Sequence, residues 1–241
     1  MLYLIGLGLN NVKDLSLKAL DVLKRCDKIL FESYTSLNRL NIDELEKLIG
    51  KSIQVAKRED IENHSDEIIN EAKTKNIAIL VIGHPLVATT HSIFLPHAKV
   101  IHNYSIFDAI TVTGLELYKF GRIVSIPFHN ATSFYDYIVR NYANDLHTLC
   151  LLDIKRDENY FMNINEALEK IKALDNKNLL KKPVVACIAL ATDDEKIFYG
   201  TYEELMQLNF SEMPKPQCLI IPSKLHPVEE EVLEHYRITK Q

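Results

Sequence analysis

The stretch IAILVIGHPLVATTH, residues 77–91, decides the fold of the first half of the chain and raises its main functional question. Its first six residues are all apolar, which is typical of a strand that is buried on both faces. The run then meets Gly83 and Pro85, which favour a turn, and small and hydroxyl-bearing residues lead on to His91. The stretch therefore predicts a central strand whose carboxyl end opens into a loop between two histidines.

Apolar and amphipathic segments alternate upstream of this stretch. We expect Asp14 to cap the first helix, and Asn41 followed by Glu44 has the spacing of a second helix start. The alternation predicts a largely parallel sheet covered by helices, whose ligands bind beyond the carboxyl ends of the strands. The strands are expected at residues 2–8, 28–31, 52–56 and 77–82, and the helices at 14–26, 41–50 and 59–75.

The second half of the chain has more strand candidates per helix, which favours a mixed sheet and a second α/β domain. Asp193 and Asp194 supply turn residues between two apolar runs and predict a hairpin. We place the domains at 1–106 and 107–241. The strands are expected at residues 121–128, 146–154, 182–191, 196–200 and 217–223, and the helices at 132–142, 163–174 and 201–208.

Composition excludes several classes of protein. The net charge of −5 argues against nucleic-acid binding through bulk positive charge, and no apolar run reaches the ~20 residues of a membrane span. The N-terminus has the pattern of a strand and not of a signal peptide. The four cysteines stand apart in apolar runs, which predicts buried free thiols and a cytoplasmic protein.

Familiar catalytic motifs are missing from the sequence. The segment GLGLN, residues 6–10, lacks the third glycine of a dinucleotide fingerprint, and there is no phosphate-binding GK[ST] and no G-x-S-x-G. His84 and His91 lack a third ligand of suitable spacing, so we expect no metal site. The small residues of 83–90 suit either backbone contacts to a compact polar cofactor or a plain strand-to-helix turn.

Several blocks, in order along nearly the whole chain, resemble the diphthine synthases, which belong to the tetrapyrrole methylase superfamily. GHPLVATTH resembles the family's G-D-P-L-V-A-T-T-H loop, and IHNYSI and TGLELYKFGR resemble two further signatures. The blocks that carry the resemblance are MLYLIGLGLNNVKDLSLKAL, FESYTS, GHPLVATTH, IHNYSI, TGLELYKFGR, SFYDYI, LHTLCLLDIK and LIIPSKLHPVEEEVL.

The resemblance implies two α/β domains with S-adenosylmethionine in the cleft between them, leaving S-adenosylhomocysteine as product. It implies a homodimer that successively methylates the amino group of a modified histidine on elongation factor 2, with no direct nucleic-acid or membrane partner. Whether three or four methyl groups are added stays open. The cofactor contacts carried over from the family are Leu9, His84, Val87, Ser105, Ile106, Leu152, Leu190 and Gln217.

The sequence departs from the family at positions that bear on the site. The family's aspartate after the glycine is His84 here, and a histidine of the family is Gln217. A neutral imidazole does not supply the fixed negative charge of a carboxylate. The segment between His91 and Ile101 is also shorter than in the family, which predicts that a helix has been trimmed.

Methyl transfer from a sulfonium requires alignment and exclusion of water more than a dedicated nucleophile, so we assign no catalytic residue. His84 or His102 is a candidate to accept the proton that the amine loses between rounds. Tyr34, Tyr104 and Tyr118 could face a trimethylammonium group, although ordinary packing is the more common role for any one of them. The alternatives are a methyltransferase of the same fold acting on a tetrapyrrole, and an impaired protein that only binds the modified factor.

Overall fold

The structure is a computed structural model that describes residues 1–34, 36, 40–155 and 158–238. Thr35, in the FESYTS block, lies outside the described residues. The chain divides into two compact units, Met1–Ala109 and Ile110–Gln241. The sequence-based division after residue 106 falls at the start of the short helix α5, which belongs to the first unit.

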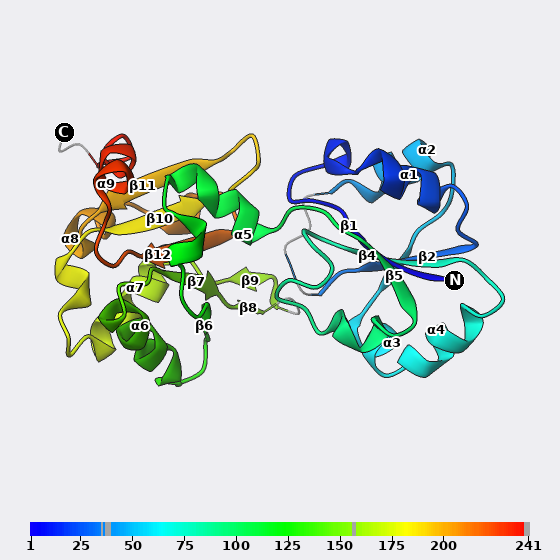
Figure 1. The fold of residues 1–241 in the computed structure, drawn as a ribbon, viewed down its shortest axis with the longest axis horizontal. Helices are drawn as coiled ribbons and strands as arrows, with labels where there is room; N and C mark the ends of the chain where they lie inside the picture. Colours follow the sequence, from blue (N-terminus) through cyan, green and yellow to red (C-terminus); the bar gives the residue numbers. More distant parts are fainter. Residues whose placement is uncertain (35, 37–39, 156–157, 239–241) are drawn as a thin grey trace. The chain divides into compact units, whose positions relative to one another are not determined.

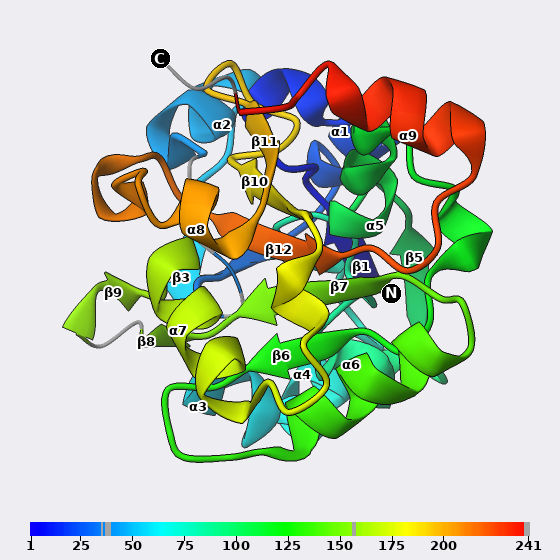
Figure 2. The ribbon, with the colours of Figure 1, turned by 90° about the vertical axis from the view of Figure 1, so that its left-hand side faces the viewer.

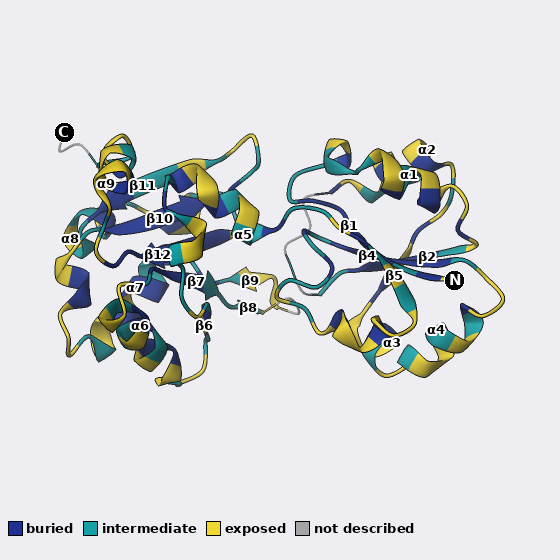
Figure 3. Ribbon diagram, viewed as in Figure 1, coloured by how far each residue is buried: buried dark blue, intermediate teal, exposed yellow. Residues whose placement is uncertain are grey.

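The first unit is built on a five-stranded sheet in which every pair of neighbouring strands is parallel. The predicted parallel sheet is therefore confirmed. Strand β4 is buried at all of its positions, as expected for the centre of such a sheet (Figure 3). The order is β3-β2-β4-β1-β5, with β1 Leu2–Gly6, β2 Lys28–Glu32, β3 Gln54–Ala56, β4 Ile77–Val81 and β5 Ala98–Ile101.

Helices cover both faces of this sheet. Helices α1 and α2 lie on one face, and α3 and α4 lie on the other (Figure 1). Separate apolar cores form on the two faces. The helices of the unit are α1 Leu17–Leu23, α2 Ile42–Ile49, α3 Arg58–Glu62, α4 Ser65–Glu71 and α5 Ile106–Ala109, with 3-10 helices at Val12–Asp14 and His91–Phe94.

The predicted ends of α2 are confirmed. The Asn41 side chain accepts a hydrogen bond from the backbone N–H of Glu44, and Gly50 ends the helix with a φ of 69°. The predicted cap of α1 was wrong, because Ser16 and not Asp14 accepts the hydrogen bond of the first turn. The Asp14 carboxylate accepts instead from the backbone of Leu9 and Asn10, so it holds the preceding loop.

Two further expectations for this unit need correction. The single helix expected at 59–75 is two helices, because the chain leaves helical geometry at His64, whose ring bonds the backbone oxygen of Glu59. Strand β5 was not predicted. At the sheet edge only its last residue, Ile101, is buried, and the short segment contains Lys99, which leaves no continuous apolar run to detect.

The second unit contains a mixed five-stranded sheet, as predicted. Strands β6 and β7 are parallel and the other neighbours are antiparallel, in the order β11-β10-β12-β7-β6 (Figure 2). The predicted hairpin is confirmed as the pair β10 and β11. The strands are β6 Val124–Ile126, β7 Thr148–Leu152, β10 Val184–Ile188, β11 Lys196–Gly200 and β12 Gln217–Ile221, with a small pair β8 Ile154–Lys155 and β9 Tyr160–Phe161.

Helices α6 and α7 build the main core of this unit against one face of the sheet. Helix α9 lies on the opposite side (Figure 1). The four cysteines are buried and free, as predicted. No helix in the described parts of the chain is long and apolar enough to cross a membrane. The helices are α6 Ser133–Ala143, α7 Ile164–Leu174, α8 Tyr202–Leu205 and α9 Pro227–Glu234, with 3-10 helices at Ile110–Thr113, Leu117–Lys119, Leu179–Lys181 and Phe210–Glu212.

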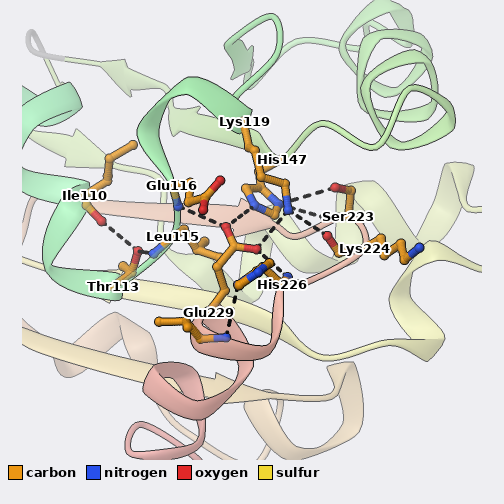
Figure 4. Close-up of polar contacts among 11 residues, drawn as sticks. Ile110, Thr113, Leu115, Glu116, Lys119, His147, Ser223, Lys224, His226 and Glu229 are labelled. Carbon is orange, nitrogen blue, oxygen red and sulfur yellow. Dashed lines mark hydrogen bonds and ion pairs between the residues drawn. The ribbon is translucent and has the colours of Figure 1, made fainter.

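A buried carboxylate fixes the start of α9 (Figure 4). Glu229 accepts hydrogen bonds from the backbone of Glu116 and His226 at 3.0 and 2.7 Å, and from Lys119 Nζ at 2.9 Å. His147 accepts the Ser223 N–H at Nδ1, so its Nε2 carries the proton and donates to Glu229 at 3.0 Å. Burial alone would raise the pKa of Glu229, but these donors outweigh it and lower the pKa to about 2.

We expect Glu229→Gln to lower the free energy of unfolding by about 3 kcal/mol, because an amide cannot accept from all four donors. The exposed Glu231→Gln on the same helix is the control and should change stability little. Since folding lowers the pKa of Glu229, its contribution is present above the ordinary value of 4.5 and is lost as pH falls towards 2. Urea denaturation followed by circular dichroism at several pH values measures the difference in unfolding free energy between the natural protein and the Glu229→Gln variant. An undiminished difference at pH 2 would contradict the role assigned to the Glu229 carboxylate.

Candidate functional site

The carboxyl ends of β1, β4 and β5 meet at one edge of the first sheet, because all three strands run parallel. Beyond that edge, the turns after β1 and β4 are tied together by their backbones. Gly83 donates its N–H to the oxygen of Gly8 at 2.8 Å, and Gly8 donates to Gly83 at 3.4 Å. The two turns therefore form one unit and not independent loops.

The glycines in these turns allow unusually close contact. A side chain at Gly6 would place its Cβ 2.5 Å from the backbone oxygen of Gly83, so none fits. Gly83 has a φ of +73°, and a Cβ there would lie 3.4 Å from Leu9 Cδ2 and 3.8 Å from the α-carbon of Ser105. Leu9 and Ser105 thus flank the space that Gly83 leaves open, and both were predicted as cofactor contacts.

Asp14 holds the turn after β1 in place. Its Oδ2 accepts the N–H of Leu9 at 3.1 Å and of Asn10 at 2.7 Å, and it also accepts the hydroxyl of Tyr104. Burial and this hydrogen bond to Asp14 raise the pKa of Tyr104 to about 12, so its hydroxyl keeps its proton at neutral pH. The Tyr104 ring, a candidate face for a cationic product, is fixed through its hydroxyl.

His84 organises the turn after β4. Its Nδ1 accepts the N–H of Leu86 at 3.1 Å, and its Nε2 lies 2.8 Å from Nδ1 of His102. A backbone N–H only donates, so Nδ1 of His84 holds a lone pair and its Nε2–H donates to His102. Burial, followed by the neighbouring His102, lowers the pKa of His84. His84 therefore has no free lone pair with which to accept a substrate proton.

Ser105 directly precedes α5 and Ile106 begins it, and residues 102–104 link them to β5. The N–H and hydroxyl of Ser105 donate to Asp108 at 2.7 and 3.0 Å, which fixes the start of this short helix. Val87 closes the neighbouring turn by donating its N–H to the oxygen of His84 at 3.2 Å. The first unit thus gathers five predicted contacts at one sheet edge: Leu9, His84, Val87, Ser105 and Ile106.

The second unit gathers the remaining three at one edge of its own sheet. Leu152 ends β7 and Gln217 begins the antiparallel neighbour β12, and the register pairs Leu151 with Cys218. On the other side of β12, Ile188 pairs with Gln217, and Leu190 follows in the turn after β10. Residues from three strand ends therefore meet here.

The side chain of Gln217 already has hydrogen-bond partners within the second unit. Its Oε1 accepts the N–H of Ile164 at 3.1 Å, at the start of α7. Its Nε2 donates to the backbone oxygens of Phe210, Met213 and Pro214 at 2.9 to 3.3 Å. Any contact of Gln217 with a cofactor would therefore come through its backbone.

Leu190 lies between two residues with left-handed backbone geometry, Ala189 with a φ of 43° and Ala191 with a φ of 61°. Non-glycine residues adopt this geometry at a cost of about 1–2 kcal/mol, and such strain concentrates at ligand sites. Asp193 and Asp194 lie in this turn, as the sequence predicted, but the strained positions are the alanines before them, which carry no turn signal.

A buried polar cluster near the end of β2 was missed by sequence reasoning. Glu32 and His91 are both almost fully buried, and the Tyr34 hydroxyl lies 3.3 Å from His91 Nε2. Burial lowers the pKa of His91, although Glu32 opposes this. Arg58 lies 5.0 Å from the centre of the Tyr34 ring and occupies one of its faces. Among the residues that the structure describes, no three His, Cys, Asp or Glu side chains are grouped to hold a metal.

Comparison with known proteins identifies the family. Residues 1–206 match the family of Tetrapyrrole (Corrin/Porphyrin) Methylases. The chain is 36% identical to the human diphthine methyl ester synthase, covering 99% of this chain and 95% of that protein. It is 38% identical to the diphthine synthase of Methanocaldococcus jannaschii, with 98% of each chain covered. A crystal structure of a diphthine synthase aligns with a TM-score of 0.89 and 31% identity, over 98% of this chain and 96% of the other.

The chain therefore belongs to the tetrapyrrole methylases, and within them to the diphthine synthases. The fold and family predicted from the sequence are confirmed, as is the class of S-adenosylmethionine-dependent methyltransferase. The alignment with the human protein spans 273 positions although this chain has 241 residues, so the relative carries segments that this chain lacks. Between β4 and β5 this chain has only the 3-10 helix His91–Phe94, where the sequence predicted a trimmed helix.

We expect Ala191→Gly to raise the free energy of unfolding by up to about 1 kcal/mol, because glycine adopts the left-handed geometry without strain. Ala186→Gly is the matched control: Ala186 lies within β10, so its replacement should lower stability by about 1 kcal/mol. Urea denaturation of both variants tests this. Equal losses in both would show that the turn after β10 is not strained.

Proposed function

We propose that this protein methylates the amino group of the modified histidine of elongation factor 2, in several successive rounds. The relatives support the reaction class, because they are diphthine synthases and diphthine methyl ester synthases from archaea and eukaryotes. The observation that carries the proposal is the space beside Gly83, flanked by Leu9 and Ser105 at converging strand ends. Such a site presents backbone and small side chains to a compact polar ligand.

The residues present fit S-adenosylmethionine. In the first unit, Leu9, Val87 and Ser105 would hold it, with the open side of Gly83 admitting close approach. In the second unit, Leu152, Leu190 and the backbone of Gln217 would contribute. When bound, the cofactor supplies a methyl group on a positively charged sulfur. The chain's task is to orient the acceptor amine and keep water out, which can lower the barrier by roughly 7–11 kcal/mol through positioning alone.

The acceptor amine must lose a proton between rounds, and we propose that bulk water takes it. His84 supports this choice, because both of its ring nitrogens are engaged, one by the Leu86 N–H and one by His102. Of the three tyrosines considered for a cationic product, Tyr118 is 86% exposed, whereas Tyr34 is covered on one face by Arg58. Tyr104 is the best placed, since Asp14 links it to the turn that carries Leu9.

We further propose a cytoplasmic homodimer. Four free buried thiols suit a reducing compartment. The dimer follows from the family resemblance and is tested by the mass of the protein in solution.

We expect Gly83→Ala to weaken binding of S-adenosylhomocysteine at least tenfold, because the added methyl group enters the space between Leu9 and Ser105. Gly50→Ala is the matched control: Gly50 also has a positive φ, but a Cβ there meets nothing within 4 Å. Both variants should lose a similar amount of stability, about 1–2 kcal/mol. Calorimetric titration separates the two effects, and equal affinities in the two variants would refute the site.

The reaction itself is tested with labelled S-adenosylmethionine and elongation factor 2 carrying the unmethylated precursor. We expect label on the factor, and mass spectrometry then counts the methyl groups. Label transfer to a tetrapyrrole instead would favour the alternative of a methyltransferase of the same fold that acts on a tetrapyrrole. Tight binding of the modified factor without any transfer would favour an impaired binding protein.

A further inference from the structure

His84, in the turn after β4, and His102, after β5, belong to a chain of hydrogen bonds that runs in one direction. The backbone N–H of Leu86 donates to Nδ1 of His84 at 3.1 Å, and Nε2–H of His84 donates to Nδ1 of His102 at 2.8 Å. The two rings are 5.0 Å apart between centroids and tilted by 34°, which suits an in-plane hydrogen bond better than stacking. The order of donors is fixed because the first one is a backbone amide.

This chain of hydrogen bonds has no place for an additional proton. If Nδ1 of His102 were protonated, its N–H would face the N–H of His84 and the bond between the rings would be lost. If Nδ1 of His84 were protonated, the hydrogen bond from Leu86 would be lost. Either event breaks one of the two hydrogen bonds that hold the His84 ring in the turn after β4.

His147 in the second unit has the same ring form as His84 but a different acceptor at Nε2. Its Nδ1 likewise accepts a backbone N–H, from Ser223, but its Nε2 donates to the carboxylate of Glu229. A carboxylate remains an acceptor beside a charged imidazole. His84 donates instead to a second imidazole, whose nitrogen is an acceptor only while it carries no proton.

The charged and titratable groups that act on His84 are His102, after β5, and Asp108, on α5. Asp108 opposes the lowering of the His84 pKa but accepts from the N–H and hydroxyl of Ser105. The Nε2 of His84 itself bonds Nδ1 of His102.

We propose that His102 is a positioning residue: by accepting the Nε2–H of His84 it fixes the ring form that holds the Leu86 amide, so cofactor binding declines as pH falls through the histidine range. The inference rests on the proposed cofactor site. Folding depresses the pKa of His84, so the stabilisation is present above its ordinary value of 6.5 and is lost as pH falls below it. An aspartate at position 84 would accept from both Leu86 and a protonated His102, which reverses the sign.

The test measures affinity for S-adenosylhomocysteine by calorimetry at pH 7.5 and 5.5. The natural protein should bind about fivefold more weakly at pH 5.5, the effect of losing one neutral hydrogen bond. His102→Asn keeps an acceptor at the Nδ1 position without titrating, so it should bind within about twofold of the natural protein at pH 7.5 and show a flatter pH profile. His102→Leu should already be about fivefold weaker at pH 7.5. His84→Asp should bind more tightly at pH 5.5 than at 7.5.

His97→Asn is the control, because His97 is an exposed histidine of the same unit and should leave the pH profile unchanged. Nitrogen-15 NMR of the ligand-free protein provides a second readout, expected to find His84 protonated on Nε2 at pH 7.5. Protonation on Nδ1, an affinity independent of pH, or identical behaviour of His102→Asn and His102→Leu would overturn the proposal. Absence of binding at any pH would instead defeat the proposed cofactor site, while the NMR result would still test the histidine pair.

Discussion

The paired backbones of Gly8 and Gly83 are the constraint on which the candidate site depends. Parallel strands bring the ends of β1 and β4 to the same edge, but the two hydrogen bonds between these glycines carry the alignment past the end of the sheet. Close approach of Gly6 to the oxygen of Gly83 leaves no room for a side chain between the turns. The positions of Leu9 and Ser105 follow from that contact, because both border the open side of Gly83.

Around this contact, each turn is held by a different polar group. Asp14 accepts hydrogen bonds from two backbone N–H groups in the turn after β1. His84 accepts from the N–H of Leu86 after β4, and Asp108 accepts from the N–H of Ser105 after β5. Each acceptor satisfies backbone donors that leave the sheet without a ladder partner. The loops therefore have defined shapes without a large apolar core of their own, as a polar ligand site requires.

Much of this architecture could be predicted from the sequence. The buried run of β4 and the cap residue Asn41 gave correct elements because local patterns determine them. The family blocks also identified the loop at Gly83, and the structure brings five of the predicted contacts to one edge. What local patterns could not provide was strand β5, whose edge position lacks an apolar run, and the strained alanines beside Leu190. The role of Asp14 depends on contacts with the turn before it and with Tyr104, and not on its place before a helix.

Gln217, where the family resemblance implies a histidine, is closely integrated into the second unit. The glutamine amide satisfies the first amide of α7 and three backbone oxygens around Phe210, from one side chain with both donor and acceptor groups. An imidazole has only two ring nitrogens and could not serve all four partners. Lys215 Nζ also donates to the oxygens of Phe210 and Met213, so a histidine at 217 would reduce the number of hydrogen bonds in this loop without leaving those two oxygens unpaired. The residue at position 217 therefore helps to set the shape of the loop around Phe210 and the start of α7, so the effect of a substitution there depends on the sequence of that loop.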